Sequence, residues 1–191
     1  PLIFHELESK DTELLFEDDA VSVSTIPLDH RVYTNGFLFK EKPAPRKLDV
    51  KAVAEHDIDR SQFNNIKNGA NGKTANGAEI ANHVLTLDPP QPKSYAFCSD
   101  TAYNETILPL IENVDVLYHE STFLESESRL CEKTKHATAK QAAQIARKAH
   151  VGNLILGHYS TRYKSIDLFK EEALEVFPRV ALADDGKSFD I

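Results

Sequence analysis

The chain has 191 residues, of which 41% are hydrophobic and 27% charged, so it has the length and composition of one soluble globular domain with a sizeable core. No apolar stretch approaches the roughly 20 residues that a membrane span needs, and no signal-peptide pattern opens the chain. The formal net charge of −8 argues against nucleic-acid binding over the whole surface, but it allows local basic patches.

The first 40 residues have the pattern of β structure. Val21, Val23 and Thr25 alternate with serines, which indicates a half-buried strand. Asp18 and Asp19 can form the turn that leads into this strand. The sequence predicts strands over residues 1–4, 12–16, 21–26 and 33–40.

The character changes over residues 41–92, which are rich in proline, asparagine, lysine and glycine. Three Asn-Gly pairs lie within ten residues, and each is a turn signal. Short helices are predicted over residues 48–55 and 61–67. Long excursions of this kind are uncommon and often functional, so we expect an inserted arm at about residues 41–92. A basic cluster lies at its start: Lys40, Lys42, Arg46, Lys47 and Lys51.

From residue 93 onward strands alternate with helices, which favours an α/β layer. Thr138 and Gln141 form a capping-box signature that opens an amphipathic helix over residues 139–150, and Gly152 is placed to end it. A second helix is predicted over residues 166–177. Residues 179–183 and 187–191 are predicted as a final pair of strands.

The two cysteines, Cys98 and Cys131, are too few for a disulfide framework. We expect both to be buried, reduced thiols. Together with the lack of a signal peptide, this predicts a cytoplasmic protein.

Three apolar runs end in side chains that can hold a metal. Residues 94–99 lead into Asp100, residues 114–118 into His119 and Glu120, and residues 153–157 into His158. Strands of an α/β sheet place their ligand groups just outside their carboxyl ends. If these runs lie side by side, their ends form one site of carboxylates and imidazoles, which suits zinc or a similar divalent ion.

Two further histidines have a comparable setting. His30 follows a strand-like run, and His136 lies just before the capped helix, where an exposed imidazole near a helix end suits proton transfer. Each residue also has an ordinary interpretation. Asp100 could cap a helix, His30 and His158 could be hydrogen-bonded core residues, and His136 could be a loop residue.

Taken together, these elements resemble one family in order, spacing and flanking residues. They are Ile26-Pro27-Leu28-Asp29-His30 with Gly36-Phe37, Cys98-Ser99-Asp100-Thr101, His119-Glu120-Ser121-Thr122-Phe123, His136-Ala137-Thr138-Ala139, and His158-Tyr159-Ser160-Thr161-Arg162-Tyr163. The set is similar to ribonuclease Z, the tRNA 3′-processing endonuclease of the metallo-β-lactamase fold. The resemblance covers about residues 21–191.

The resemblance implies an α/β protein, specifically a four-layer αββα sandwich of which residues 1–191 would be the C-terminal portion. It implies two zinc ions per intact site, with His30 and His158 each binding one ion and Asp100 bridging both. His136 would handle the leaving-group proton with help from Glu120. The implied RNA-binding residues, in or near the arm and in the last motif, are Lys40, Lys42, Arg46, Lys47 and Arg162.

The implied activity is zinc-dependent removal of 3′ trailers from precursor tRNA by a homodimer without membrane association. The family's main metal motif, His-x-His-x-Asp-His, should lie upstream of His30, where this sequence has only His5. We therefore expect the chain alone to be inactive. Two alternatives remain at this point, namely another hydrolase or phosphodiesterase of the same fold, and a non-catalytic fragment that folds and oligomerises.

Overall fold

The computed structural model describes residues 2–191, which divide into two compact units. The first unit combines residues 2–41 with residues 93–191, and the second is Lys42–Pro92. Within the described residues, no helix has the length and apolar character that a membrane crossing requires.

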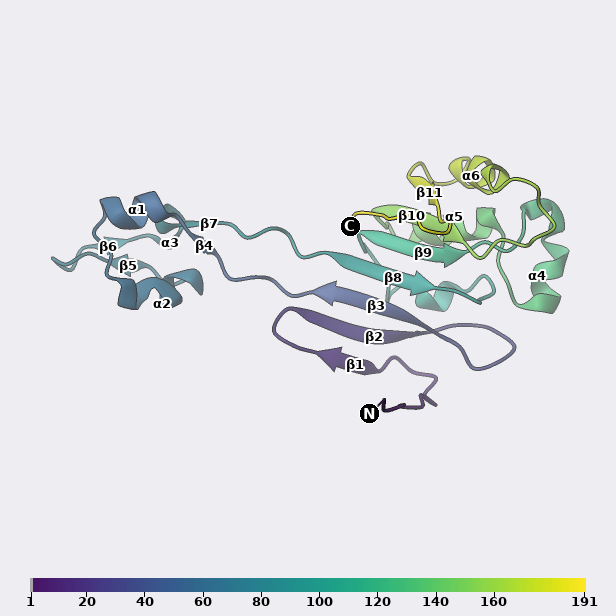
Figure 1. Ribbon diagram of the computed structural model, residues 1–191, viewed down its shortest axis with the longest axis horizontal. Coiled ribbons are helices and arrows are strands. Elements are labelled where there is room, and N and C mark those ends of the chain that lie inside the picture. The colour runs from purple at the N-terminus through teal and green to yellow at the C-terminus, as the bar shows by residue number, and fades with distance from the viewer. Residues whose placement is uncertain (1) are drawn as a thin grey trace. The chain divides into compact units, whose positions relative to one another are not determined.

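The first unit is built on a seven-stranded sheet, in the order β1-β2-β3-β8-β9-β10-β11 (Figure 1). The pairs from β1 to β8 are antiparallel, whereas β8, β9, β10 and β11 run parallel. The bounds of the strands are β1 Leu14–Glu17, β2 Val21–Pro27, β3 Asn35–Glu41, β8 Ser94–Cys98, β9 Val116–Glu120, β10 Asn153–Gly157 and β11 Val180–Leu182.

Strand β10 is the most continuously apolar of the parallel strands. Four of the five residues of β10 are buried, as expected for a parallel strand that is covered on its faces. The strand predicted over residues 21–26 is β2, in which the valines and serines are all half-buried.

Helices cover one face of the sheet. The chief helix is α5 (Ala139–Lys148), whose N-terminus has the predicted capping box between Thr138 and Gln141. Its alanines and Ile145 pack with the helix-facing side chains of the strands and with Phe169 of α6 (Asp167–Leu174). Shorter elements connect the layers: η2 Glu105–Ile107, η3 Glu125–Glu127 and α4 Arg129–Thr134.

Helix α5 ends earlier than predicted, and Gly152 is not the residue that ends it. The helix stops at Lys148, and His150 takes the left-handed conformation with a φ of 54°. Gly152 instead lies against Asp115, the residue before β9, where an added Cβ would come within 2.4 Å of the Asp115 carbonyl oxygen. Its lack of a side chain permits this close approach of two backbone segments.

Three other predicted elements differ from the structure. Residues 2–4 form no strand, and Pro1 lies outside the described residues. Residues 187–191 also form no strand, so β11 pairs with β10 alone. The helix predicted over residues 166–177 is shorter in the structure, where α6 spans Asp167–Leu174. Pro178 follows soon after, and a proline disfavours the helical conformation in the residue before it.

The second unit has a small core of its own, formed by Val53, Ile58, Ile66 and Leu85. Asp49 caps its first helix by accepting from the backbone N–H groups of Lys51 and Ala52. Its helices are α1 Val50–Glu55, η1 Arg60–Gln62, α2 Phe63–Lys67 and α3 Asn82–Leu85. Its strands form two pairs: β4 Lys47–Leu48 with β7 Thr86–Leu87, and β5 Gly72–Lys73 with β6 Glu79–Ile80.

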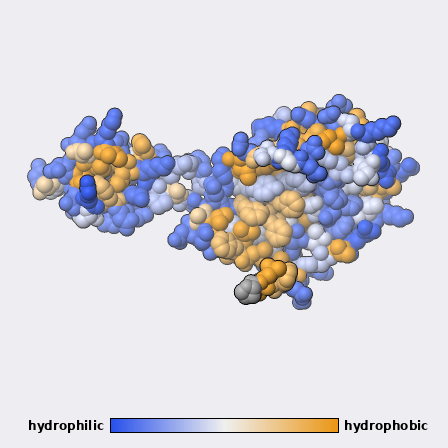
Figure 2. All heavy atoms as spheres, in the orientation of Figure 1, coloured by the Kyte–Doolittle hydropathy of each residue, from blue (hydrophilic) through white to orange (hydrophobic). Residues whose placement is uncertain are grey.

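The sheet face opposite the helices carries aromatic side chains. Leu38 and Ala96 are buried on the helix side, so their neighbours along β3 and β8 point to the other face. There Phe39 stacks on Tyr95 with ring centroids 5.9 Å apart, and Phe97 stacks on Tyr118 at 4.7 Å. Figure 2 shows hydrophobic residues gathered over this part of the sheet, and Phe39 is 38% exposed.

We expect the chain to self-associate through this aromatic sheet face, because soluble monomers rarely leave a large apolar patch open to water. Analytical ultracentrifugation at high micromolar concentration should detect dimers or larger species. Phe39→Lys should weaken the association, whereas Val50→Lys, on the second unit, should not. A strictly monomeric chain that binds no hydrophobic dye would contradict this expectation.

A candidate metal and catalytic centre at the carboxyl ends of three strands

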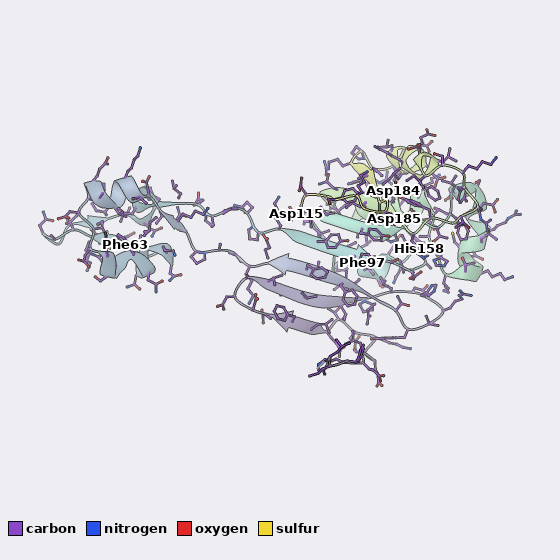
Figure 3. All side chains as sticks on the ribbon, in the orientation of Figure 1. Phe63, Phe97, Asp115, His158, Asp184 and Asp185 are labelled. Atoms are coloured by element: carbon purple, nitrogen blue, oxygen red, sulfur yellow. The ribbon has the colours of Figure 1, made fainter. Side chains whose placement is uncertain are left out.

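Three neighbouring parallel strands bring Asp100, Glu120 and His158 to one edge of the sheet. The condition that their three apolar runs lie side by side is met, since β9 pairs with β8 on one side and with β10 on the other. Cys98 is opposite His119, and Gly157 is opposite Glu120, so the strands end almost level. Figure 3 shows His158 at this end of the sheet.

His119 does not belong to the centre, although the sequence pointed to it as a possible ligand. Its side chain is fully buried, and its Nδ1 lies 2.7 Å from the Glu120 carbonyl oxygen. Burial lowers the pKa of His119 and so keeps the imidazole neutral. A buried, neutral histidine of this kind acts as a core residue.

Asp100 and His158 share an unusual backbone conformation shortly after the ends of their strands. Their φ angles are 58° and 59°, in the left-handed region that residues other than glycine seldom adopt. Such conformations gather at functional sites. The structure also excludes two of the ordinary interpretations. Asp100 caps no helix, and His158 lies on the surface rather than in the core.

His30 enters the centre from the loop after β2. Its Nδ1 lies 2.9 Å from the Lys135 carbonyl oxygen, which can only accept, so Nδ1 carries the proton and Nε2 keeps a lone pair. The ring lies beside that of His136, with centroids 5.1 Å apart, and His136 lies 5.2 Å from the ring of His158. The three imidazoles are therefore neighbours.

His136 is held by a buried carboxylate rather than left exposed as predicted. Its Nδ1 lies 2.6 Å from Glu120 Oε1, and the exposed fractions of the two side chains are 14% and 0%. The proton must be on Nδ1, because a carboxylate oxygen only accepts. The ring is thereby fixed in one orientation with Nε2 pointing away from Glu120.

Glu120 is buried, but its oxygens have ample partners. Besides His136, it accepts from the backbone N–H groups of Thr101 at 2.9 Å, Thr122 at 3.1 Å and Ala137 at 3.1 Å. The Thr122 hydroxyl adds a contact of 2.6 Å. This set of donors offsets the cost of burying the charge.

Two residues that the sequence reasoning missed orient the histidines. Lys135, with a φ of 60°, presents its carbonyl oxygen to His30. The Thr122 hydroxyl lies 2.9 Å from His158 Nδ1. Thr122 could have been identified from the sequence, because it belongs to the His-Glu-Ser-Thr element. The Lys135 carbonyl oxygen could not, because every residue has a backbone carbonyl group.

The donor set fits divalent metal ions. Ligand atoms of His30, Asp100 and His136 lie within 4.8 Å of one another, and so do those of Glu120, His136 and His158. His158 Nε2 and Asp100 Oδ1 are 3.1 Å apart. Histidines that bind metals usually donate their other ring N–H to an outer oxygen, which is the arrangement of His30. Mixed nitrogen and oxygen ligands suit zinc.

The lysine and arginine side chains predicted to bind RNA differ in their exposure and in their contacts. Lys40 and Lys47 are exposed, on β3 and β4, and Lys42 is half-buried. Arg46 donates to Thr86 Oγ1 at 2.6 Å and pairs with Asp88. Arg162 lies over the Phe123 ring, 5.1 Å from its centroid, and 3.9 Å from Glu127 Oε2.

The chain is similar to curated proteins over nearly its whole length, although no family model matches it. It is 40% identical over 190 residues to ribonuclease Z of Bacteroides thetaiotaomicron and 42% identical over 190 residues to ribonuclease Z of Cytophaga hutchinsonii. The matches cover 100% and 99% of this chain, but the chain spans only 60% of either relative.

Solved structures give the same fold. The crystal structure of human tRNase Z, short form, matches 95% of this chain with a TM-score of 0.53 at 19% identity, over 48% of its own length. The metallo-β-lactamase fold protein YhfI from Bacillus subtilis matches 92% with a TM-score of 0.59 at 17% identity, over 51% of its length. At these identities the likeness establishes the fold alone.

Proposed function

The chain is related to ribonuclease Z over its whole length and has the metallo-β-lactamase fold, and from this premise we propose that it carries part of the active site of a tRNA 3′-processing endonuclease. The proposed reaction is hydrolysis of the phosphodiester bond that follows the discriminator nucleotide of a precursor tRNA. One observation carries the proposal. Two histidines and a carboxylate suited to metal binding lie beside a third histidine that is fixed by a buried carboxylate.

We assign His30, Asp100 and His158 as the ligands of two zinc ions, with Asp100 reaching both. Bound zinc would supply Lewis-acid stabilisation of developing negative charge and activate the attacking water. Asp100 suits a shared position because its carboxylate lies at the end of the central strand β8, within reach of both His30 and His158.

His136 has a separate task in this scheme. Its Nδ1–H is committed to Glu120 Oε1, so Nε2 is the atom that can deliver a proton to the departing 3′ oxygen. Glu120 stabilises the imidazolium form that must exist before that proton leaves. The hydrogen bond to Glu120 also holds the ring between those of His30 and His158.

The substrate-binding part of the proposal rests on cationic side chains. Lys40, Lys42, Arg46, Lys47 and Arg162 would contact the phosphates of the tRNA. The aromatic sheet face would support a homodimer.

We expect this chain alone to hold well under two zinc ions. His30, Asp100 and His158 are fewer ligands than two four-coordinate sites need, even where Asp100 serves both. Metal analysis after dialysis against zinc-free buffer measures the content directly. Two tightly held ions per chain would contradict the expectation, unless ligands come from a second copy.

The function is best tested with a joined protein, in which this chain is fused to the part of the Bacteroides thetaiotaomicron relative that it does not span. The joined protein should bind zinc and shorten a 3′-extended tRNA transcript, whereas the chain alone should leave the transcript intact. Efficient cleavage by the chain alone would refute the ligand argument. A folded, zinc-loaded joined protein that leaves the transcript intact would refute the proposed function.

A further inference from the structure

We propose that Thr122 is a positioning residue, whose hydroxyl fixes His158 with its proton on Nδ1 and its Nε2 lone pair directed at Asp100. Through this hydroxyl, the one carboxylate of Glu120 would orient both His136 and His158. The inference rests on the proposed function only in calling His158 a metal ligand. The hydrogen bonds that fix the ring lie within this chain.

The two carboxylate oxygens of Glu120 face two different side chains. Oε1 faces His136 Nδ1 at 2.6 Å, and Oε2 faces the Thr122 hydroxyl at 2.6 Å. With three backbone N–H groups also directed at it, this carboxylate is surrounded by donors. An ionised carboxylate only accepts hydrogen bonds, so the hydroxyl must donate to Oε2.

A threonine hydroxyl has one proton to give, and Glu120 takes it. The same oxygen lies 2.9 Å from His158 Nδ1 and can act there only as an acceptor. His158 Nδ1 must therefore carry a proton, and in the neutral ring Nε2 is left with its lone pair. An unconstrained imidazole in water prefers the opposite tautomer, so the contact with Thr122 selects the minor form.

The selected tautomer is the one that a metal site needs. His158 Nε2 lies 3.1 Å from Asp100 Oδ1. Two atoms that both present lone pairs repel each other at this distance, and a shared divalent ion relieves the repulsion. An outer oxygen that accepts the second ring N–H of a ligating histidine is a common feature of metal sites.

The burial of Glu120 and Thr122 means that the Thr122 hydroxyl itself, and not a water molecule, must make these hydrogen bonds. Glu120 is fully buried and Thr122 is 8% exposed, so water cannot readily replace the hydroxyl. The backbone of Thr122 makes hydrogen bonds that do not involve the hydroxyl, since its N–H donates to Glu120 Oε2 at 3.1 Å and its carbonyl oxygen accepts from the Ser160 N–H at 3.1 Å. Thr122→Val would therefore remove the hydroxyl while leaving the shape and the backbone contacts in place.

The test is to read the protonation of the His158 ring by NMR. Long-range proton–nitrogen spectra of the chain at pH 8 report which ring nitrogen carries the proton, and His158→Asn assigns the signal. We expect Nδ1–H in the wild type, a shift towards Nε2–H in Thr122→Val, and recovery of Nδ1–H in Thr122→Ser. Nε2–H in the wild type would overturn the inference, whether or not the valine variant folds. An unchanged ring in a folded Thr122→Val variant would overturn it as well.

A second measurement connects the tautomer to the metal. In the joined protein, Thr122→Val should weaken zinc binding roughly 10- to 100-fold, the usual cost of losing an outer-shell partner, and Thr122→Ser should restore it. Unchanged affinity would remove the link to the metal. If the tautomer and affinity shift as expected but the joined protein cleaves no tRNA, the proposed function fails and the positioning role stands.

Discussion

Replacing His136 with alanine in the joined protein is expected to lower kcat for tRNA cleavage by roughly 10²- to 10⁴-fold, the usual loss when a general acid is removed. The zinc content should stay close to that of the wild type. The physical reason is the geometry of the ring, since its Nδ1–H is committed to Glu120 and it lies between the proposed ligands His30 and His158. Single-turnover kinetics combined with metal analysis of the same sample separate the two effects.

A matched control is His83→Ala, because His83 is an exposed residue of α3 in the second unit. It should change neither kcat nor zinc content appreciably. Loss of zinc together with activity in His136→Ala would show that His136 is a metal ligand, and the roles assigned to the histidines would then be wrong.

Replacing Glu120 with alanine is expected to lower the free energy of unfolding of the chain by about 3–5 kcal/mol, because it leaves several buried donors without an acceptor. These donors are the N–H groups of Thr101, Thr122 and Ala137, the Thr122 hydroxyl and the His136 ring. Urea denaturation followed by circular dichroism measures the change. Glu112→Ala, at an exposed position, is the control and should lie within about 0.5 kcal/mol of the wild type. A Glu120→Ala variant as stable as this control would show that the buried carboxylate is dispensable to the fold.

The sequence was sufficient to predict much of the sheet. The runs that became β8, β9 and β10 are short, mostly apolar and followed by polar residues, so their type and approximate bounds could be predicted from the pattern alone. The capping box of α5 could also be predicted, because it depends on two side chains three residues apart. Local signals of this kind do not depend on the rest of the fold.

Other features depend on tertiary contacts and could not be predicted. Gly152 looked like a helix terminator, but its backbone approaches Asp115. Residues 187–191 were predicted as a strand but form none in the structure. Residues 166–177 looked helical throughout, but α6 is confined to Asp167–Leu174.

In the candidate centre too, some features could be predicted from the sequence and others could not. His30, Asp100, Glu120, His136 and His158 could be identified because their side chains carry the chemistry. Their orientation could not, since it depends on the left-handed conformations of Asp100 and His158, on the Lys135 carbonyl oxygen and on the Thr122 hydroxyl. His119 was a candidate ligand because it lies at the same end of the sheet, but its side chain is fully buried.

The most direct test of the account is mass spectrometry of the products that the joined protein forms from a 3′-extended tRNA. Attack by water on phosphorus, with His136 protonating the departing 3′ oxygen, breaks the bond between phosphorus and that oxygen. The account therefore predicts a tRNA that ends in a 3′-hydroxyl at the discriminator nucleotide and a trailer that begins with a 5′-phosphate. A 2′,3′-cyclic phosphate on the tRNA, or an intact precursor in the presence of the zinc-loaded protein, would contradict it.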